Sequence, residues 1–187
     1  MKRKLFFSAI TLMAFSFIQA QTTPAGYEAG KVTLADGSII GGFIKEDLKK
    51  NSSITFILNA TAPKQEYNAS QINAAEINGT QYLCIKGDFF KVLITGKLSF
   101  LQKASNAAGK AIYNGTEPIF SAGTEGKIGD YFSFANNSLK VITKKNISTF
   151  ITSELAGCNA AIEKAKTVNG DVAALADAVT VYNNSFK

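Results

Sequence analysis

The spacing of apolar residues changes once along this chain, and this change limits the fold more than any other feature. As far as residue 143, apolar residues alternate with polar ones in short runs that end at turn residues. After Lys145 they recur every three to four positions, which is the spacing of one helical face. Strands followed by helices predict an α+β fold, with C-terminal helices packed on a mainly antiparallel β-sheet.

Turn dipeptides mark where the strands of this sheet reverse direction. Asp36-Gly37 and Asn78-Gly79 favour the two-residue turns of β-hairpins, and a further hairpin crosses Asn136-Asn137. We expect a sheet of about six to eight strands. Its main segments are 31–45, 53–58, 76–85, 89–101 and 131–142.

Three amphipathic stripes follow, and we expect each to form a helix. Asn146, Asn159 and Asp171 precede these stripes and are residue types that cap helices. A helix with one apolar face must bury it, and the sheet is the obvious partner. We therefore expect a single domain over residues 21–187, whose strand-rich part (21–143) and helical part (144–187) share one core.

Residues 1–20 have the form of a secretory signal peptide. A short basic start is followed by an uncharged apolar run, Leu5–Ile18, and by the small residue Ala20 at the cleavage point. The run is shorter than the roughly 20 apolar residues that a membrane span needs, and no later stretch is long and apolar enough to span. We expect export to the periplasm, the outer surface or the medium.

Residues 104–130 differ in composition from the strands around them. They are rich in Ala, Gly, Asn and Thr and contain Pro118, which predicts a flexible loop or insertion. Because binding residues concentrate on loops held by a scaffold, Tyr113, Ile119 and Phe120 are the candidate contact residues. We expect the fold to survive the removal of this segment.

The composition excludes several kinds of chemistry. The 187 residues include no His and no Trp, and Arg3 is the only Arg. Catalytic sites that need His and metal sites that use imidazole therefore cannot form within this chain. Loss of the basic start would lower the formal net charge from +6 by three. The remaining charge is weak for a protein that binds nucleic acid. The sequence indicates no cofactor, no metal site and no nucleic-acid partner.

The two cysteines leave alternatives open. Export would permit a disulfide between Cys84 and Cys158, provided that their Cα atoms lie within about 7 Å. Alternatively, Cys84 is a small apolar residue of a strand and Cys158 is a free thiol near the start of a helix. Without a His as base, a nucleophilic role for Cys158 is disfavoured.

The remaining candidates for catalysis are acids and a Ser–Lys pair. A glycosidase needs two carboxylates that face one bond, whereas Glu66, Glu76, Asp88 and Asp130 are scattered singly along the chain. Their positions favour solvated acids at turns and strand ends. A Ser–Lys pair assembled in space stays open, although no Ser-x-x-Lys motif occurs.

Several segments together resemble one family of small exported proteins. The longest are GKVTLADGSIIGGFI at 30–44 and FFKVLITGKLSF at 89–100, and shorter ones lie at 54–56, 67–72, 157–158 and 182–183. In these segments the chain resembles uncharacterised small secreted proteins that are common in Bacteroidetes. The resemblance implies an envelope or secreted setting in a Gram-negative bacterium, and it implies no activity.

Export and the lack of catalytic motifs lead to one main hypothesis about function. We expect a non-enzymatic envelope or secreted module that binds a protein partner or a small ligand. The alternatives are a hydrolase that uses carboxylates or a Ser–Lys pair, and a structural envelope protein. A concave pocket with converging titratable groups would favour the hydrolase, whereas large exposed apolar patches would favour the structural protein.

Overall fold

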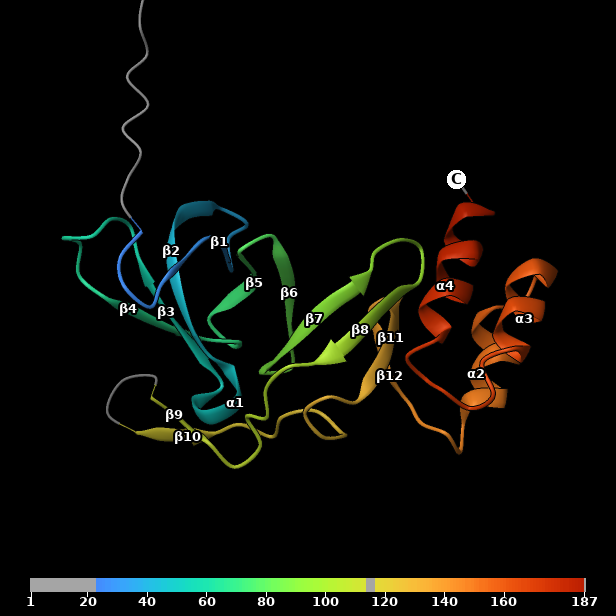
Figure 1. Ribbon diagram of the computed structural model, residues 1–187. Coiled ribbons are helices and arrows are strands. Elements are labelled where there is room, and N and C mark those ends of the chain that lie inside the picture. Colours follow the sequence, from blue (N-terminus) through green and yellow to red (C-terminus); the bar gives the residue numbers. More distant parts are fainter. Residues whose placement is uncertain (1–22, 114–116, 187) are drawn as a thin grey trace, which may run out of the picture.

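The computed structural model describes residues 23–113 and 117–186, and its main feature is one long antiparallel sheet (Figure 1). The signal peptide expected at residues 1–20 lies outside the described residues. The sheet has ten strands in the order β12-β11-β8-β7-β6-β5-β1-β2-β3-β4. The ten strands are β1 (Glu28–Leu34), β2 (Ile39–Asp47), β3 (Ser53–Ile57), β4 (Gln65–Asn68), β5 (Ile72–Ile77), β6 (Thr80–Ile85), β7 (Asp88–Ile94), β8 (Ser99–Lys103), β11 (Tyr131–Ala135) and β12 (Ser138–Ile142).

The α+β fold and the mainly antiparallel sheet are confirmed, but the expected number of six to eight strands is wrong. Strand β4 is one that the apolar pattern does not reveal, because Gln65, Glu66 and Asn68 are polar. It forms because its backbone pairs with β3, with Ser53 opposite Asn68 and Thr55 opposite Glu66. A separate two-stranded sheet pairs β9 (Ala111–Tyr113) with β10 (Pro118–Phe120).

The first six strands curl around an apolar cluster of their own. An isolated bridge between Ala69 and Gly87 brings the end of β4 to the β6–β7 turn. The fully buried side chains inside this curl include Val32, Ile44 and Ile54. The short helix α1 (Leu48–Asn51) closes one end of the cluster, since Leu48 is also buried there. The start of β3 and the end of β4, which pair with each other, thus lie beside α1.

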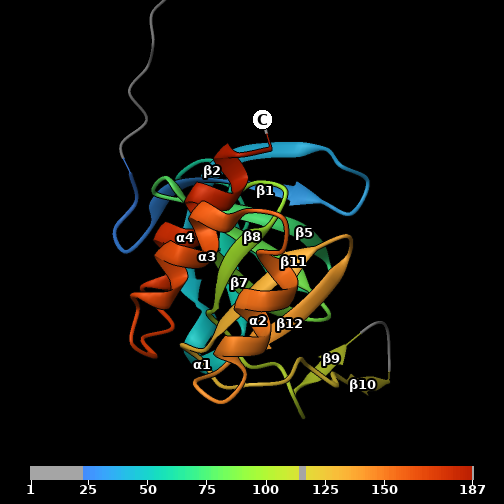
Figure 2. The ribbon, with the colours of Figure 1, turned by 90° about the vertical axis from the view of Figure 1, so that its right-hand side faces the viewer.

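The C-terminal helices bury their apolar faces against the other half of the sheet. Viewed from the helix side, α2 (Ile147–Glu154), α3 (Asn159–Lys166) and α4 (Leu175–Asn184) lie in front of β7, β8 and β11 (Figure 2). Their cluster combines Phe100 and Leu98 of the β7–β8 hairpin with helix residues such as Phe150 of α2 and Val179 of α4. The expected packing of helices on the sheet is therefore present.

Helix α4 is fixed to the sheet by polar contacts as well. The side chain of Asn183 accepts a hydrogen bond from the Leu98 N–H at 2.9 Å and donates one to the Leu98 carbonyl, also at 2.9 Å. Gly96 makes this approach feasible, because a Cβ at that position would lie 2.4 Å from the Asn183 side chain. The helix begins at Leu175, later than expected, and Asp171 accepts a bond from the Ala173 N–H in the preceding turn.

The opposite face of this half-sheet carries a third cluster. Phe90 and Phe132 meet edge to face with their ring centres 5.0 Å apart, and Leu101 is fully buried beside them. Half-buried apolar side chains, Phe134 and Val141 among them, surround this cluster. Because successive residues of a strand point to opposite faces, Leu101 lies here while Phe100 faces the helices.

Candidate functional site

A buried ion pair holds the segment that follows β8. Asp88 and Lys103 lie 3.1 Å apart, and neither side chain is exposed. The Asp88 carboxylate accepts hydrogen bonds from the Ala107 N–H at 2.7 Å and from the Thr124 hydroxyl at 2.6 Å. The Lys103 ammonium donates to the carbonyl groups of residues 124–126. Buried charges persist when partners of this kind satisfy them.

Both ends of the 104–130 segment, which the sequence predicts to be a flexible loop or insertion, are therefore held at the sheet by these bonds. The sequence position of Asp88 favours a solvated acid. In the structure Asp88 is fully buried and accepts hydrogen bonds from residues at both ends of the segment. Between these ends, β9 and β10 form a hairpin that lies below the main sheet in Figure 1. The Lys110 ammonium, at the base of this hairpin, donates to the Lys50 carbonyl of α1.

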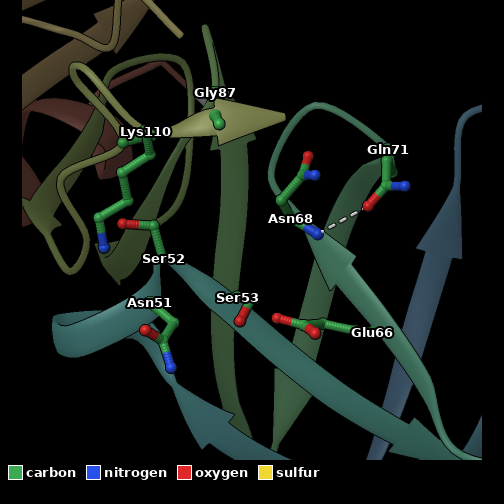
Figure 3. Close-up of a pocket in the computed structure, with 10 residues that line it drawn as sticks. Asn51, Ser52, Ser53, Glu66, Asn68, Gln71, Gly87 and Lys110 are labelled. Atoms are coloured by element: carbon green, nitrogen blue, oxygen red, sulfur yellow. Dashed lines mark hydrogen bonds between the residues drawn. The ribbon is translucent and has the colours of Figure 1, made fainter. Parts of the chain in front are cut away.

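This anchoring creates a pocket of about 250 Å³ between α1, the ends of β3 and β4, and the base of the hairpin. We call it the polar pocket (Figure 3). Two charged residues line it, Glu66 from β4 and Lys110 from the hairpin base. The side chains with amide or hydroxyl groups that line it are Asn51, Ser52, Ser53, Asn68 and Gln71.

The pairing of β3 with β4 explains why this face is polar. Ser53 and Asn68 are opposite each other, and Glu66 lies two residues before Asn68 on the same face of the sheet. The intervening residues Ile54 and Tyr67 belong to the apolar cluster on the other face. The two strands therefore bury one face and present polar groups to the pocket with the other.

Ser52 combines a buried hydroxyl group that has no hydrogen-bond partner in the described structure with a left-handed backbone conformation. Its backbone adopts the left-handed conformation (φ 56°) at the end of α1, which lets its N–H donate to the Leu48 carbonyl at 3.0 Å. The residue is only 2% exposed, and its hydroxyl has no hydrogen-bond partner among the described residues. A buried hydroxyl without a partner costs about 1–3 kcal/mol, and a left-handed conformation costs about 1–2 kcal/mol in a residue other than glycine.

The amide side chains are held in place by their oxygen atoms. The Gln71 side-chain oxygen accepts from the Asn68 N–H at 2.9 Å, and the Asn68 side-chain oxygen accepts from the Ser70 N–H at 2.9 Å. Neither bond uses an amide NH₂ group, so these donors are available to a ligand. The pocket thus combines oriented donors, hydroxyl groups, one carboxylate and one ammonium group.

The two cysteines are free and lie in different parts of the molecule, so the structure contains no Cys84–Cys158 disulfide. Cys84 packs against the cluster inside the curl of β1–β6, whereas Cys158 belongs to the helix cluster. Burial raises the pKa of Cys84 to about 12. Hydrogen bonds with the Ser185 hydroxyl and the Ala161 N–H lower the pKa of Cys158.

The contact residues proposed from the sequence lie on the hairpin next to the pocket. Ile119 and Phe120 of β10 are 57% and 67% exposed. Tyr113 ends β9, and its side chain lies outside the described part of the chain. The pocket wall is instead formed by Ala111 of β9 and by Ala107 and Lys110, which precede the hairpin. Sequence reasoning missed these residues and Ser52, since they meet only after the segment is anchored.

Within residues 23–113 and 117–186, no three His, Cys, Asp or Glu side chains come together as metal ligands. None of the helices in the described part of the chain is long and apolar enough to cross a membrane.

Comparison with protein-family models, with curated proteins and with solved structures found no match.

Proposed function

We propose that this chain is an exported, non-enzymatic module that binds a small polar ligand in the polar pocket. The observation that carries the proposal is the Ser52 hydroxyl, which is buried in the pocket wall without a partner. A glycine at this position would relieve both the backbone strain and the unsatisfied hydroxyl. A ligand that turns the Ser52 side chain into the pocket and hydrogen-bonds to it would satisfy this hydroxyl.

Binding is favoured over hydrolysis by the geometry around Ser52. A serine nucleophile needs a general base within hydrogen-bonding reach, at about 2.6–3.2 Å. Lys110 lines the same pocket, but its ammonium donates to the Lys50 carbonyl, and the Ser52 hydroxyl has no partner in the described structure. The hydrolase remains the rival hypothesis. Steady hydrolysis of p-nitrophenyl acetate that disappears in Ser52→Gly would support the hydrolase and contradict the binding module.

Export is the second part of the proposal. Its support is the basic start and the apolar run within residues 1–20, together with the resemblance to small secreted proteins. A ligand-binding module of this kind would meet its ligand outside the cytoplasm. N-terminal sequencing of the protein recovered from the cell envelope or medium tests this part, and a chain that retains residues 1–20 would contradict it.

The binding experiment uses the chain from Gln21 onward and six probes: glucose, N-acetylglucosamine, L-alanine, L-alanyl-L-alanine, succinate and spermidine. Saturation-transfer NMR reports which probes bind. Ala111→Trp fills the pocket from its exposed rim, and Ala60→Trp is the control on an exposed turn outside the pocket. We expect at least one probe to bind the unmodified chain and Ala60→Trp but not Ala111→Trp. The proposal fails if no probe binds, or if all binding survives Ala111→Trp.

Ser52→Gly provides an independent readout. We expect it to stabilise the free protein by about 1 kcal/mol, because it removes strain and an unsatisfied hydroxyl. The same change should weaken binding of the probe. Asn137→Gly is the matched control, since Asn137 also has a positive φ of 59° and lies in the β11–β12 turn, outside the pocket. A stability gain without loss of binding would remove Ser52 from the site.

A further inference from the structure

We infer that the ligand of the polar pocket is a zwitterion of amino-acid or dipeptide size, whose carboxylate meets Lys110 and whose ammonium group meets Glu66. This inference rests on the proposed function and adds the chemical class of the ligand. It is carried by the placement of one acid and one base in a pocket whose other polar groups are uncharged.

The two charges are separated across the pocket. In Figure 3, Lys110 and Glu66 lie on opposite sides, and Ser52 and Ser53 lie between them. Glu66 extends from β4 and Lys110 from the base of the hairpin, so each side chain has its own support. Neither takes part in an ion pair among the described residues. The pocket therefore offers a positive and a negative group that do not neutralise each other directly.

Each charged group retains capacity for a ligand. The Lys110 ammonium has three donors, of which one bonds to the Lys50 carbonyl. Glu66 is exposed, and its carboxylate can accept several hydrogen bonds from an ammonium group. The Ser53 hydroxyl and the amide donors of Asn68 and Gln71 can bond to the polar atoms between the two ends of such a ligand, and the buried Ser52 hydroxyl can do so once its side chain turns into the pocket.

Charge complementarity favours a zwitterion over anionic, cationic and uncharged ligands. A phosphate or a dicarboxylate would meet the like charge of Glu66, and a polyamine would meet that of Lys110. A neutral sugar would use the hydroxyl and amide groups but would leave both charges without a partner. The volume of about 250 Å³ also lies below the roughly 300–1,000 Å³ of pockets for drug-sized ligands. A small molecule that carries both charges fits all of these features.

Calorimetric titration of the chain from Gln21 onward tests the inference with three related probes. L-Alanyl-L-alanine carries both charges, N-acetyl-L-alanyl-L-alanine lacks the ammonium group, and L-alanyl-L-alaninamide lacks the carboxylate. L-Alanine and glucose extend the series to a shorter zwitterion and to an uncharged probe. We expect the free dipeptide or L-alanine to bind, and loss of either charge from the dipeptide to weaken its binding at least about tenfold.

Two variants assign the charges to their residues. Glu66→Gln should abolish the preference for a free ammonium group, and Lys110→Met should abolish the preference for a free carboxylate. Glu28→Gln and Lys144→Met are the matched controls, because both residues are exposed and outside the pocket. The controls should retain both preferences. Equal binding of the charged and blocked dipeptides would overturn the inference.

The remaining outcomes separate this inference from the proposed function. If glucose binds and the dipeptide and L-alanine do not, and Ala111→Trp abolishes glucose binding, the pocket is a ligand site but its ligand is not a zwitterion. If dipeptide binding survives Ala111→Trp, both proposals are wrong. If none of these probes binds, the zwitterion is excluded, and the wider panel of six probes decides on the proposed function.

Discussion

The Asp88 carboxylate and the Lys103 ammonium lie 3.1 Å apart with no exposed surface on either side chain. Asp88 is the first residue of β7 and Lys103 is the last of β8; Lys103 lies opposite Phe90, so Asp88, two residues earlier in β7, is its diagonal neighbour on the same face. Each also bonds to the segment that follows, which keeps Ala107 and Lys110 beside α1. The ion pair thus connects the sheet to one wall of the polar pocket.

Asp88→Asn should lower the free energy of unfolding by about 3–5 kcal/mol, because it leaves the Lys103 charge buried without a counter-ion. Urea unfolding followed by circular dichroism measures the change. Lys31→Met is the control, since Lys31 and Glu76 form a more exposed pair whose loss should cost at most about 1 kcal/mol. A similar, small effect of both variants would show that the buried pair does not anchor the segment.

Two deletions distinguish the anchored ends of the 104–130 segment from its hairpin. Deletion of 104–130 should abolish cooperative unfolding, because Asp88 and Lys103 then lose their partners in the segment. Replacement of residues 112–119 by Gly-Gly keeps those partners and should change stability by only about 1 kcal/mol. Differential scanning calorimetry measures both. Cooperative unfolding of the larger deletion would restore the view of the segment as a dispensable insertion.

Asn183→Ala should destabilise the protein by about 2 kcal/mol, because the Leu98 N–H and carbonyl groups lose their buried partner. Amide hydrogen exchange should also become faster throughout α4. Asn184→Ala changes the exposed neighbour and should stay within about 0.5 kcal/mol of the unmodified protein. Equal stability of the two variants would mean that α4 is not held by this contact.

Stability should fall as the pH rises from about 9 to about 12. Burial raises the pKa of Tyr82 to about 12, assisted by the nearby Glu46 carboxylate, and burial alone raises that of Cys84 to about 12. The unfolded chain releases these protons at lower pH, so the contribution of both groups is complete below about pH 8.5 and is lost towards pH 12. Urea midpoints at pH 8 and pH 11 measure the loss.

The double variant Tyr82→Phe, Cys84→Ala provides the comparison for this pH dependence. It should show a smaller loss between pH 8 and pH 11, because neither replacement ionises. The same loss in the unmodified chain and in the double variant would contradict the assignment to these two groups.

Local sequence signals predicted the turns and the helical stripes well. Asn78-Gly79 and Asn136-Asn137 adopt the positive φ angles that short hairpin turns require. The helical spacing after Lys145 likewise corresponds to three helices packed on the sheet. These features depend on residues that are neighbours in the chain, which is why the pattern alone reveals them.

The buried ion pair and the pocket depend on partners that are distant in the chain. Nothing near Asp88 distinguishes it from a solvated acid in a turn, because its partners come from the end of β8 and from both ends of the 104–130 segment. Likewise, Ser52 becomes part of a site only when Glu66 and Lys110 arrive from two other segments. The sequence predicted most of the elements, β4 excepted among the strands of the main sheet, but not which polar residues they would bring together.

The most direct test of the polar pocket is a titration followed by ¹H–¹⁵N NMR of the chain from Gln21 onward. The six probes of the binding panel are added in separate titrations, and the shift of every assigned amide is recorded. We predict saturable shifts, for at least one of the six probes, that are largest at residues 51–53, 66–71 and 107–111. No saturable shift with any of the six, or shifts centred on the apolar face around Phe134 and Val141, would contradict a ligand site in this pocket.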